Sequence, residues 1–152
     1  NPVAKKNSIV WTNIDYQHAK KSADTMYNTG NLQSMLITGT QWDTTMKCLQ
    51  YNGFDVYDSR TWGNYKDSIG NAASGSGVKQ SSGFSEYWKA YNIYDLAGNT
   101  VKWTSEFIDN AYSAVRSAYV GASGISHPAY RANRLFNNLS GNVSFRVTLL
   151  FK

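Results

Sequence analysis

Residues 92–106, NIYDLAGNTVKWTSE, carry the strongest fold signal in the chain. Two short runs of β-branched and aromatic residues, 93–96 and 101–103, flank Gly98 and Asn99. Apolar runs separated by Gly and Asn are typical of short strands joined by a turn. The stretch therefore predicts the beginning of a strand-rich half of the protein.

Two segments further downstream also have the composition of strands. Residues 114–120 and 143–151 are short, β-branched and aromatic, and Gly, Asn and Ser separate them from their neighbours. In the second segment every other side chain is apolar, which places one apolar row on a single sheet face. We expect this last strand to lie at the centre of the sheet. The row consists of Val143, Phe145, Val147, Leu149 and Phe151.

The first third predicts a strand, a helix and an apolar connection. Residues 8–11 have the composition of a short strand, and Thr12 or Asn13 can cap a helix that ends near Gly30. We expect residues 32–37 to form an apolar connection. The expected apolar face of the helix consists of Ala19, Ala23 and Met26 or Tyr27.

A second helix is predicted from a capping-box pattern in residues 40–43, TQWD. Trp42, Met46 and Leu49 fall on one face of this helix, and Gly53 follows its end. Cys48, the one cysteine of the chain, has no partner for an internal disulfide, and we expect it to be a small core residue. We interpret both helices as scaffold.

Residues 55–91 are rich in Gly, Ser, Asn and Asp, and residues 70–83 have almost pure loop composition. We expect a long loop here. Trp62 and Trp88 interrupt it, and anchoring on the core is favoured over ligand contact for both.

Composition limits the classes of function. A chain of 152 residues fits one domain, and 41% hydrophobic with only 16% charged residues indicates a folded protein with a polar, weakly charged surface. The formal net charge is +5, but the cations are scattered, whereas nucleic-acid binding needs a clustered basic stripe. No apolar run is long enough for a membrane span. We expect no nucleic-acid partner, no membrane insertion by this domain, and a parent polypeptide that is longer.

Residues 107–151 contain no Lys, Glu, Gln, Trp, Met or Cys. In the preceding part of the chain the first five of these types occupy 24 of 106 positions. Strand-rich segments are poor in Glu, Lys and Gln in any case, and this explanation stays open. It does not account for the missing Trp.

Residues 92–106 resemble the hallmark of the formylglycine-generating (sulfatase-modifying) enzyme family, which is close to N-x-Y-D-M-x-G-N-V-W-E-W-T. The resemblance extends to residues 38–43 (TGTQWD), 59–65 (SRTWGNY) and 144–147 (SFRV). It implies an α+β protein with a C-type-lectin-like fold of the formylglycine-generating-enzyme subtype. In such a fold two helices pack on a small, mostly antiparallel sheet with long loops.

The catalytic groups of that family are missing. Its oxidases bind copper through a cysteine pair near the C-terminal end, because soft thiolates select Cu(I), and no cysteine follows Cys48. Iron-binding relatives use a histidine cluster, whereas this chain has only His18 and His127. We therefore expect a non-enzymatic protein without a cofactor. Lys102 replaces a carboxylate that helps hold a structural calcium next to Asn99, which disfavours that ion as well.

Residues 116–131, RSAYVGASGISHPAYR, together with SFRV at 144–147, resemble the variable region of diversity-generating retroelement target proteins. That region reads R-G-G, S-G, P-A-x-x-R and G-F-R-V around its variable positions, and this chain departs at RSA, at the spacing before Arg131 and at SFRV. In that family reverse transcription substitutes bases at template adenines, chiefly in AAY codons. Changing the first two bases of such a codon never encodes Lys, Glu, Gln, Trp or Met, which would explain the composition gap.

The second resemblance implies a single ligand-binding domain over residues 1–152 with a variable region at about 107–147. Expected framework positions are Arg116, Gly121, Gly124, Pro128, Arg131 and the strand with Phe145 and Val147. The diversified positions should face solvent together and bind the ligand, as aromatic and small polar side chains do in paratopes. They are Tyr119, Val120, Ala122, Ile125, Ser126, His127, Tyr130, Ala132, Asn133, Leu135, Phe136 and Asn137.

These expectations describe a hypervariable receptor or adhesin-type domain, outside the cell, on a cell surface or on a phage virion. Its partner would be a protein or a glycan on another cell or surface. An exposed loop histidine without a role stays open for His127, and burial stays open for Leu135 and Phe136. Two other functions also stay open, a formylglycine-generating-type oxidase relative and a fixed, calcium-assisted carbohydrate-binding lectin.

Overall fold

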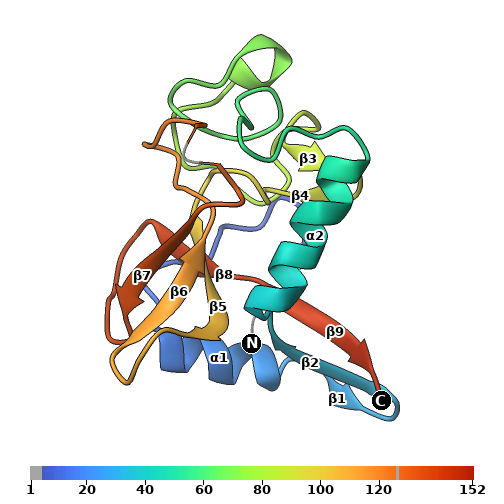
Figure 1. Cartoon of the computed structure of the whole chain (residues 1–152), viewed down its shortest axis with the longest axis vertical. Helices are drawn as coiled ribbons and strands as arrows, with labels where there is room; N and C mark the ends of the chain where they lie inside the picture. Colours follow the sequence, from blue (N-terminus) through green and yellow to red (C-terminus); the bar gives the residue numbers. More distant parts are fainter. Residues whose placement is uncertain (1–4, 126) are drawn as a thin grey trace.

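The computed structural model describes residues 5–125 and 127–152 (Figure 1). It contains two α-helices, a short 3₁₀-helix and nine strands in these residues, and none of the helices is long and apolar enough to cross a membrane. The helices are α1 (Tyr16–Asp24), α2 (Gly39–Tyr51) and η1 (Gly70–Ala73). The strands are β1 (Asn28–Thr29), β2 (Leu32–Leu36), β3 (Lys89–Ala90), β4 (Ile93–Tyr94), β5 (Val101–Phe107), β6 (Tyr112–Arg116), β7 (Arg131–Leu135), β8 (Val143–Phe145) and β9 (Val147–Phe151).

The strands form three small sheets, with the orders β1-β2-β9, β3-β4 and β7-β6-β5-β8. β5 pairs in parallel with β8, and the other strand pairs are antiparallel. The predicted α+β class with two helices and mostly antiparallel strands is confirmed. The strands divide among three sheets, however, and do not form the single small sheet that we expected.

Both helices begin at a polar cap, but not at the predicted residues. The Asp15 carboxylate accepts from the His18 amide at 2.8 Å and caps α1, because Asn13 has a left-handed backbone (φ 56°) and turns the chain before the helix. Thr38 caps α2 in a capping box with Gln41. Thr40 already lies inside this helix, so the expected start was two residues late.

Three segments differ from the structure predicted for them. Residues 8–11 form no strand. Residues 32–37 were expected to connect two helices, but most of them form β2, which pairs with β9. The last apolar segment divides at Arg146 into two strands. Before Arg146 it pairs with β5 as β8, and after Arg146 it pairs with β2 as β9. At the division the Ile37 amide donates to the Arg146 carbonyl at 3.3 Å. β8 and β9 therefore each lie at a sheet edge, not at a centre.

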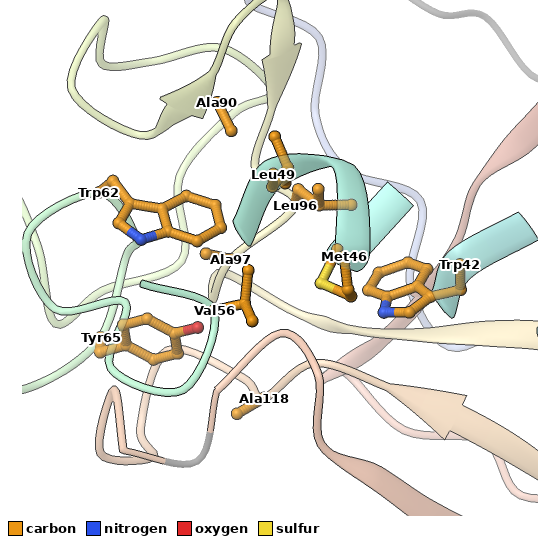
Figure 2. Close-up of a cluster of buried hydrophobic side chains, with 10 residues drawn as sticks. All are labelled: Trp42, Met46, Leu49, Val56, Trp62, Tyr65, Ala90, Leu96, Ala97 and Ala118. Carbon is orange, nitrogen blue, oxygen red and sulfur yellow. The ribbon is translucent and has the colours of Figure 1, made fainter. Parts of the chain in front are cut away.

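The core consists of two apolar clusters. Figure 2 shows the first, where Trp42, Met46 and Leu49 of α2 meet Trp62 and the long loop, confirming the predicted face of the helix. The second joins α1 to one face of the four-stranded sheet through buried side chains. Its members are Ile14, Tyr16, Ala19, Ala23, Leu36, Val101, Trp103, Val115 and Val143. Cys48 lies off the buried face of α2 and is exposed, so its predicted core position was wrong.

The long loop is held by buried side chains. Trp62 and Trp88 are both buried, and the Trp88 indole donates to the Ala72 carbonyl at 2.8 Å, which confirms the anchoring interpretation. Asn64 and Asn99, also buried, bond to each other and to loop backbone groups at Gly77 and Gln80. These amides satisfy backbone groups that a loop of this composition could not pair by itself.

Candidate ligand-binding surface

The predicted variable region contains a loop, residues 117–130, that joins two paired strands. β6 pairs with β7 from Arg116 opposite Arg131 to Tyr112 opposite Leu135, and β7 is the outer strand of the sheet. β7 was not predicted, because its sequence RANRL lacks an apolar alternation. Figure 1 shows β6 and β7 side by side. We call the described residues of the loop, together with β7 and Asn137, the β6–β7 surface.

Four contacts tie the backbone of the loop to the scaffold. The buried Trp42 indole Nε1 donates to the Pro128 carbonyl at 2.8 Å. The Gly124 amide donates to the Asp67 carboxylate at 2.8 Å, and its carbonyl accepts from the Ser59 amide at 3.3 Å. The Val120 amide donates to the Asn99 carbonyl at 3.2 Å. A loop anchored through its backbone keeps its course when side chains change.

Six of the predicted ligand-binding residues present exposed side chains. Ile125 is 60% exposed, Tyr130 47% and Leu135 43%, which answers the open question of burial for Leu135. Asn133 and Leu135 lie on the same face of β7 as Arg131, because side chains alternate along a strand. The exposed residues are Tyr119, Ile125, Tyr130, Asn133, Leu135 and Asn137.

The expectation that all twelve positions face solvent was wrong for several of them. Val120 is buried, since it follows the buried residues Ser117 and Ala118 into the scaffold. Ala132 and Phe136 turn to the other face of the sheet and pack on the cluster under α1, where the Phe136 ring lies 4.9 Å from that of Tyr16. Ala122 packs on the cluster around α2. Ser126 lies outside the described residues. Whether any of these positions contacts a ligand stays a prediction.

His127 is half-buried between two tyrosines. Its ring meets Tyr57 edge-to-face at 5.0 Å and Tyr130 at 6.4 Å. Burial lowers the pKa of its imidazole, so the neutral form is favoured near neutral pH. Tyr57, which is exposed and comes from the long loop, extends the surface and was missed. Its local sequence has no feature that separates it from the other exposed tyrosines.

A charged group borders the surface. Arg116 is buried and forms ion pairs with Asp43 of α2 at 3.0 Å and with Glu106 of β5 at 3.1 Å. Glu106 also accepts from the half-exposed Arg131 side chain at 2.6 Å. The framework role expected for Arg116 agrees with its burial. Arg131, in contrast, is accessible enough to contact a ligand directly.

The region that corresponds to the calcium segment of the first resemblance contains a buried lysine side chain instead. The buried Lys102 ammonium donates to the Gly98 carbonyl at 2.7 Å. Among residues 5–125 and 127–152 no three His, Cys, Asp or Glu side chains gather so that they could hold a metal ion. The absence of a cofactor stays a prediction.

Neither protein-family models nor curated proteins match the chain. Two solved structures are similar to it. The structure of PvdO from Pseudomonas aeruginosa has a TM-score of 0.68 and 16% identity, over 90% of this chain and 60% of that one. Treponema denticola variable protein 1 has a TM-score of 0.58 and 16% identity, over 79% of this chain and 48% of that one. The chain thus spans about half to three fifths of the length of these proteins, and we conclude that it is an α+β protein with a C-type-lectin-like fold.

Proposed function

We propose that the chain is the ligand-binding domain of a variable protein diversified by a retroelement. The observation that carries the proposal is the distribution of exposure in the segment that lacks six residue types. Six of the twelve candidate positions expose their side chains together on the β6–β7 surface, while the loop backbone is tied to residues outside the segment, such as Trp42 and Asp67. The fold likeness to a protein named a variable protein supports the proposal.

The chemistry of the surface suits recognition of a protein or a glycan. Tyr119, Tyr130 and Ile125 offer large contact areas, and aromatic rings lose little conformational entropy on binding. Asn133 and Asn137 offer amides that can donate and accept hydrogen bonds. Binding would be non-enzymatic and would need no cofactor. The domain would belong to a longer polypeptide displayed outside the cell, on a cell surface or on a phage.

The coding DNA tests this proposal. We expect a nearby repeat, almost identical to the last third of the coding sequence, whose differences coincide with adenines, and a reverse transcriptase gene beside it. The differing codons should include those of Tyr119, Ile125, Tyr130 and Asn133. They should spare the codons of Arg116 and Pro128, on which the scaffold depends. Differences spread evenly over all four bases would refute retroelement diversification.

A display library tests the structural side of the same proposal. Randomising the six exposed positions should leave most members folded, whereas randomising six half-buried or buried positions of the same segment should unfold most members. The second set is Val115, Val120, Ala122, Ala132, Phe136 and Val143. Equal losses of folded protein in both libraries would show that the surface does not tolerate diversity.

A further inference from the structure

A pocket of about 610 Å³ lies at the edge of the four-stranded sheet opposite to β7. Its lining comes from the beginning of β5, from β8 with Arg146, from the residues around β4, and from residues 5–11. β7 forms the other edge of the sheet and belongs to the β6–β7 surface. The pocket is therefore a separate candidate site.

The charged residues that line the pocket are mostly cationic. Lys5, Lys6, Lys102 and Arg146 face a single carboxylate, that of Asp95. Lys6 is paired with Glu86 outside this set. Lys102 is buried and Arg146 is half-buried, and neither forms an ion pair with Asp95. Burial and the charge of Arg146 lower the pKa of the Lys102 ammonium well below its usual range. The charge of Asp95 raises this pKa, and a further anion beside the ammonium would act in the same direction.

Several hydrogen-bonding groups of the lining have donors or acceptors without a partner among the described residues. The Arg146 guanidinium donates to the Tyr94 carbonyl, but its buried Nε has no partner among the described residues. The Lys102 ammonium uses one of its three donors on Gly98. The hydroxyls of Thr100 and Ser144 bond to each other at 2.6 Å, so one O–H of the pair is left to donate elsewhere. Among the described residues of this lining, Arg146 Nε and Asp95 Oδ1 are the buried side-chain atoms without a hydrogen-bond partner.

Part of the remaining lining is apolar, and Ser8, Ser82 and Asn92 add polar groups. Trp11 and Phe145 meet edge-to-face at 5.8 Å, and Ile93 and Val147 add aliphatic surface. A ligand that fits therefore combines an anionic head with an apolar body. A planar head with two acceptor oxygens matches the fork of a guanidinium better than a spherical ion does.

We propose that this pocket binds a small organic carboxylate with an apolar body, its carboxylate held by Lys102 and Arg146. The carboxylate would accept hydrogen bonds from the Arg146 Nε and the spare ammonium donors, and the apolar body would pack against Trp11 and Phe145. The source can be a free acid or the C-terminal carboxylate of a peptide, since both present the same head.

Titration of the whole chain with hydrocinnamate, with its uncharged amide and with acetate tests the proposal, using backbone amide resonances and calorimetry. We expect hydrocinnamate to bind about tenfold or more tightly than either the amide or acetate, because a hydrogen bond to a charged group is lost in one case and apolar contact in the other. Shifted resonances should be those of Gly83, Lys102, Ser144 and Arg146. A glycyl-glycyl-phenylalanine peptide that binds equally well would identify a chain terminus as the source, and one that does not would identify a free acid.

Two matched variants locate the charge. Lys102→Met removes the ammonium and keeps the length of the side chain, and it should weaken binding of hydrocinnamate about tenfold. Lys47→Met removes an exposed cation from α2 and should leave binding unchanged. If Lys102→Met does not fold, the affinities of the unchanged protein for hydrocinnamate and for its amide still test whether the pocket binds a carboxylate. Equal affinity for the two, no binding at millimolar concentration, or resonance shifts confined to residues 117–137 would overturn the proposal.

Discussion

Replacing Gly98 with Ala should destabilise the protein severely, while the same replacement at Gly53 should be mild. Both glycines have left-handed backbones, with φ of 74° and 88°. A Cβ on Gly98 would lie 2.7 Å from the carbonyl carbon and 2.8 Å from the nitrogen of Asn64, and it would also overlap the carbonyl oxygen. A Cβ on Gly53 would have no neighbour within 4 Å. Comparing Gly98→Ala with Gly53→Ala therefore separates the cost of steric overlap from the cost of a left-handed backbone conformation.

The left-handed conformation costs an L residue about 1–2 kcal/mol at either position. At Gly98 the added Cβ would overlap backbone atoms of Asn64, not a side chain that could rotate away. The backbones of residues 64 and 98 must therefore also move apart. This movement weakens the hydrogen bonds from the Asn99 amide to Asn64 (2.9 Å) and from the Asn64 amide to Ala97 (3.3 Å), at about 1 kcal/mol each. We expect a loss of roughly 3–4 kcal/mol for Gly98→Ala and roughly 1–2 kcal/mol for Gly53→Ala.

Urea denaturation followed by tryptophan fluorescence measures both losses, as shifts of the midpoint at unchanged slope. Because the Gly98 amide donates to the Ser117 hydroxyl at 3.2 Å, amide exchange in residues 117–130 should also accelerate in Gly98→Ala. It should not accelerate in Gly53→Ala. Equal destabilisation by the two substitutions would refute the steric argument, and unchanged exchange would refute the link between Gly98 and the β6–β7 loop.

Three further predictions concern the anchoring, the surface and the acid stability. Trp42→Phe removes the donor to the Pro128 carbonyl and should cost roughly 1–3 kcal/mol in urea denaturation; a loss below a few tenths would show that this bond does not hold the loop. Tyr119→Ala and Asn137→Ala should each change the free energy of unfolding by less than about 0.5 kcal/mol, and a larger loss at either would assign it to the scaffold. Hydrogen bonds from Lys6, Lys89 and Tyr94 lower the pKa of Glu86 to about 2, so its contribution to stability is present above its ordinary pKa and disappears as the pH falls through about 2. Glu86→Gln should therefore be less stable than the unchanged protein at pH 6, and this difference should shrink as the pH falls toward 2 in a pH series of denaturation curves; a constant difference would exclude this linkage.

Local patterns predicted much of the scaffold. The apolar face of α2, the positive φ of Gly53 beyond its end and the burial of Trp62 and Trp88 all follow from spacing and residue type. Errors arose where a distant segment decides the outcome. Residues 143–151 alternate like one strand, but Arg146 joins two sheets, and that division depends on the pairing of β2 with β9.

The β6–β7 surface was predicted as a region but not residue by residue. β7 escaped prediction because an outer strand with one face toward solvent needs few apolar residues. Tyr57 joins the surface only because the long loop carries it to His127. Contacts between segments this far apart leave no periodicity in either of them.

The class of fold followed from the resemblance of residues 92–106 to a known family. The two helices, the anchoring tryptophans and the segment with the unusual composition followed from local periodicity and residue type, which every window of the chain contains. Which side chains of that segment reach solvent depends on the packing of distant elements against it. Phe136 and Ala132 are turned inward by the cluster under α1, and Tyr130 and Asn133 are left outside, because exposure is set by what packs against each face of a strand.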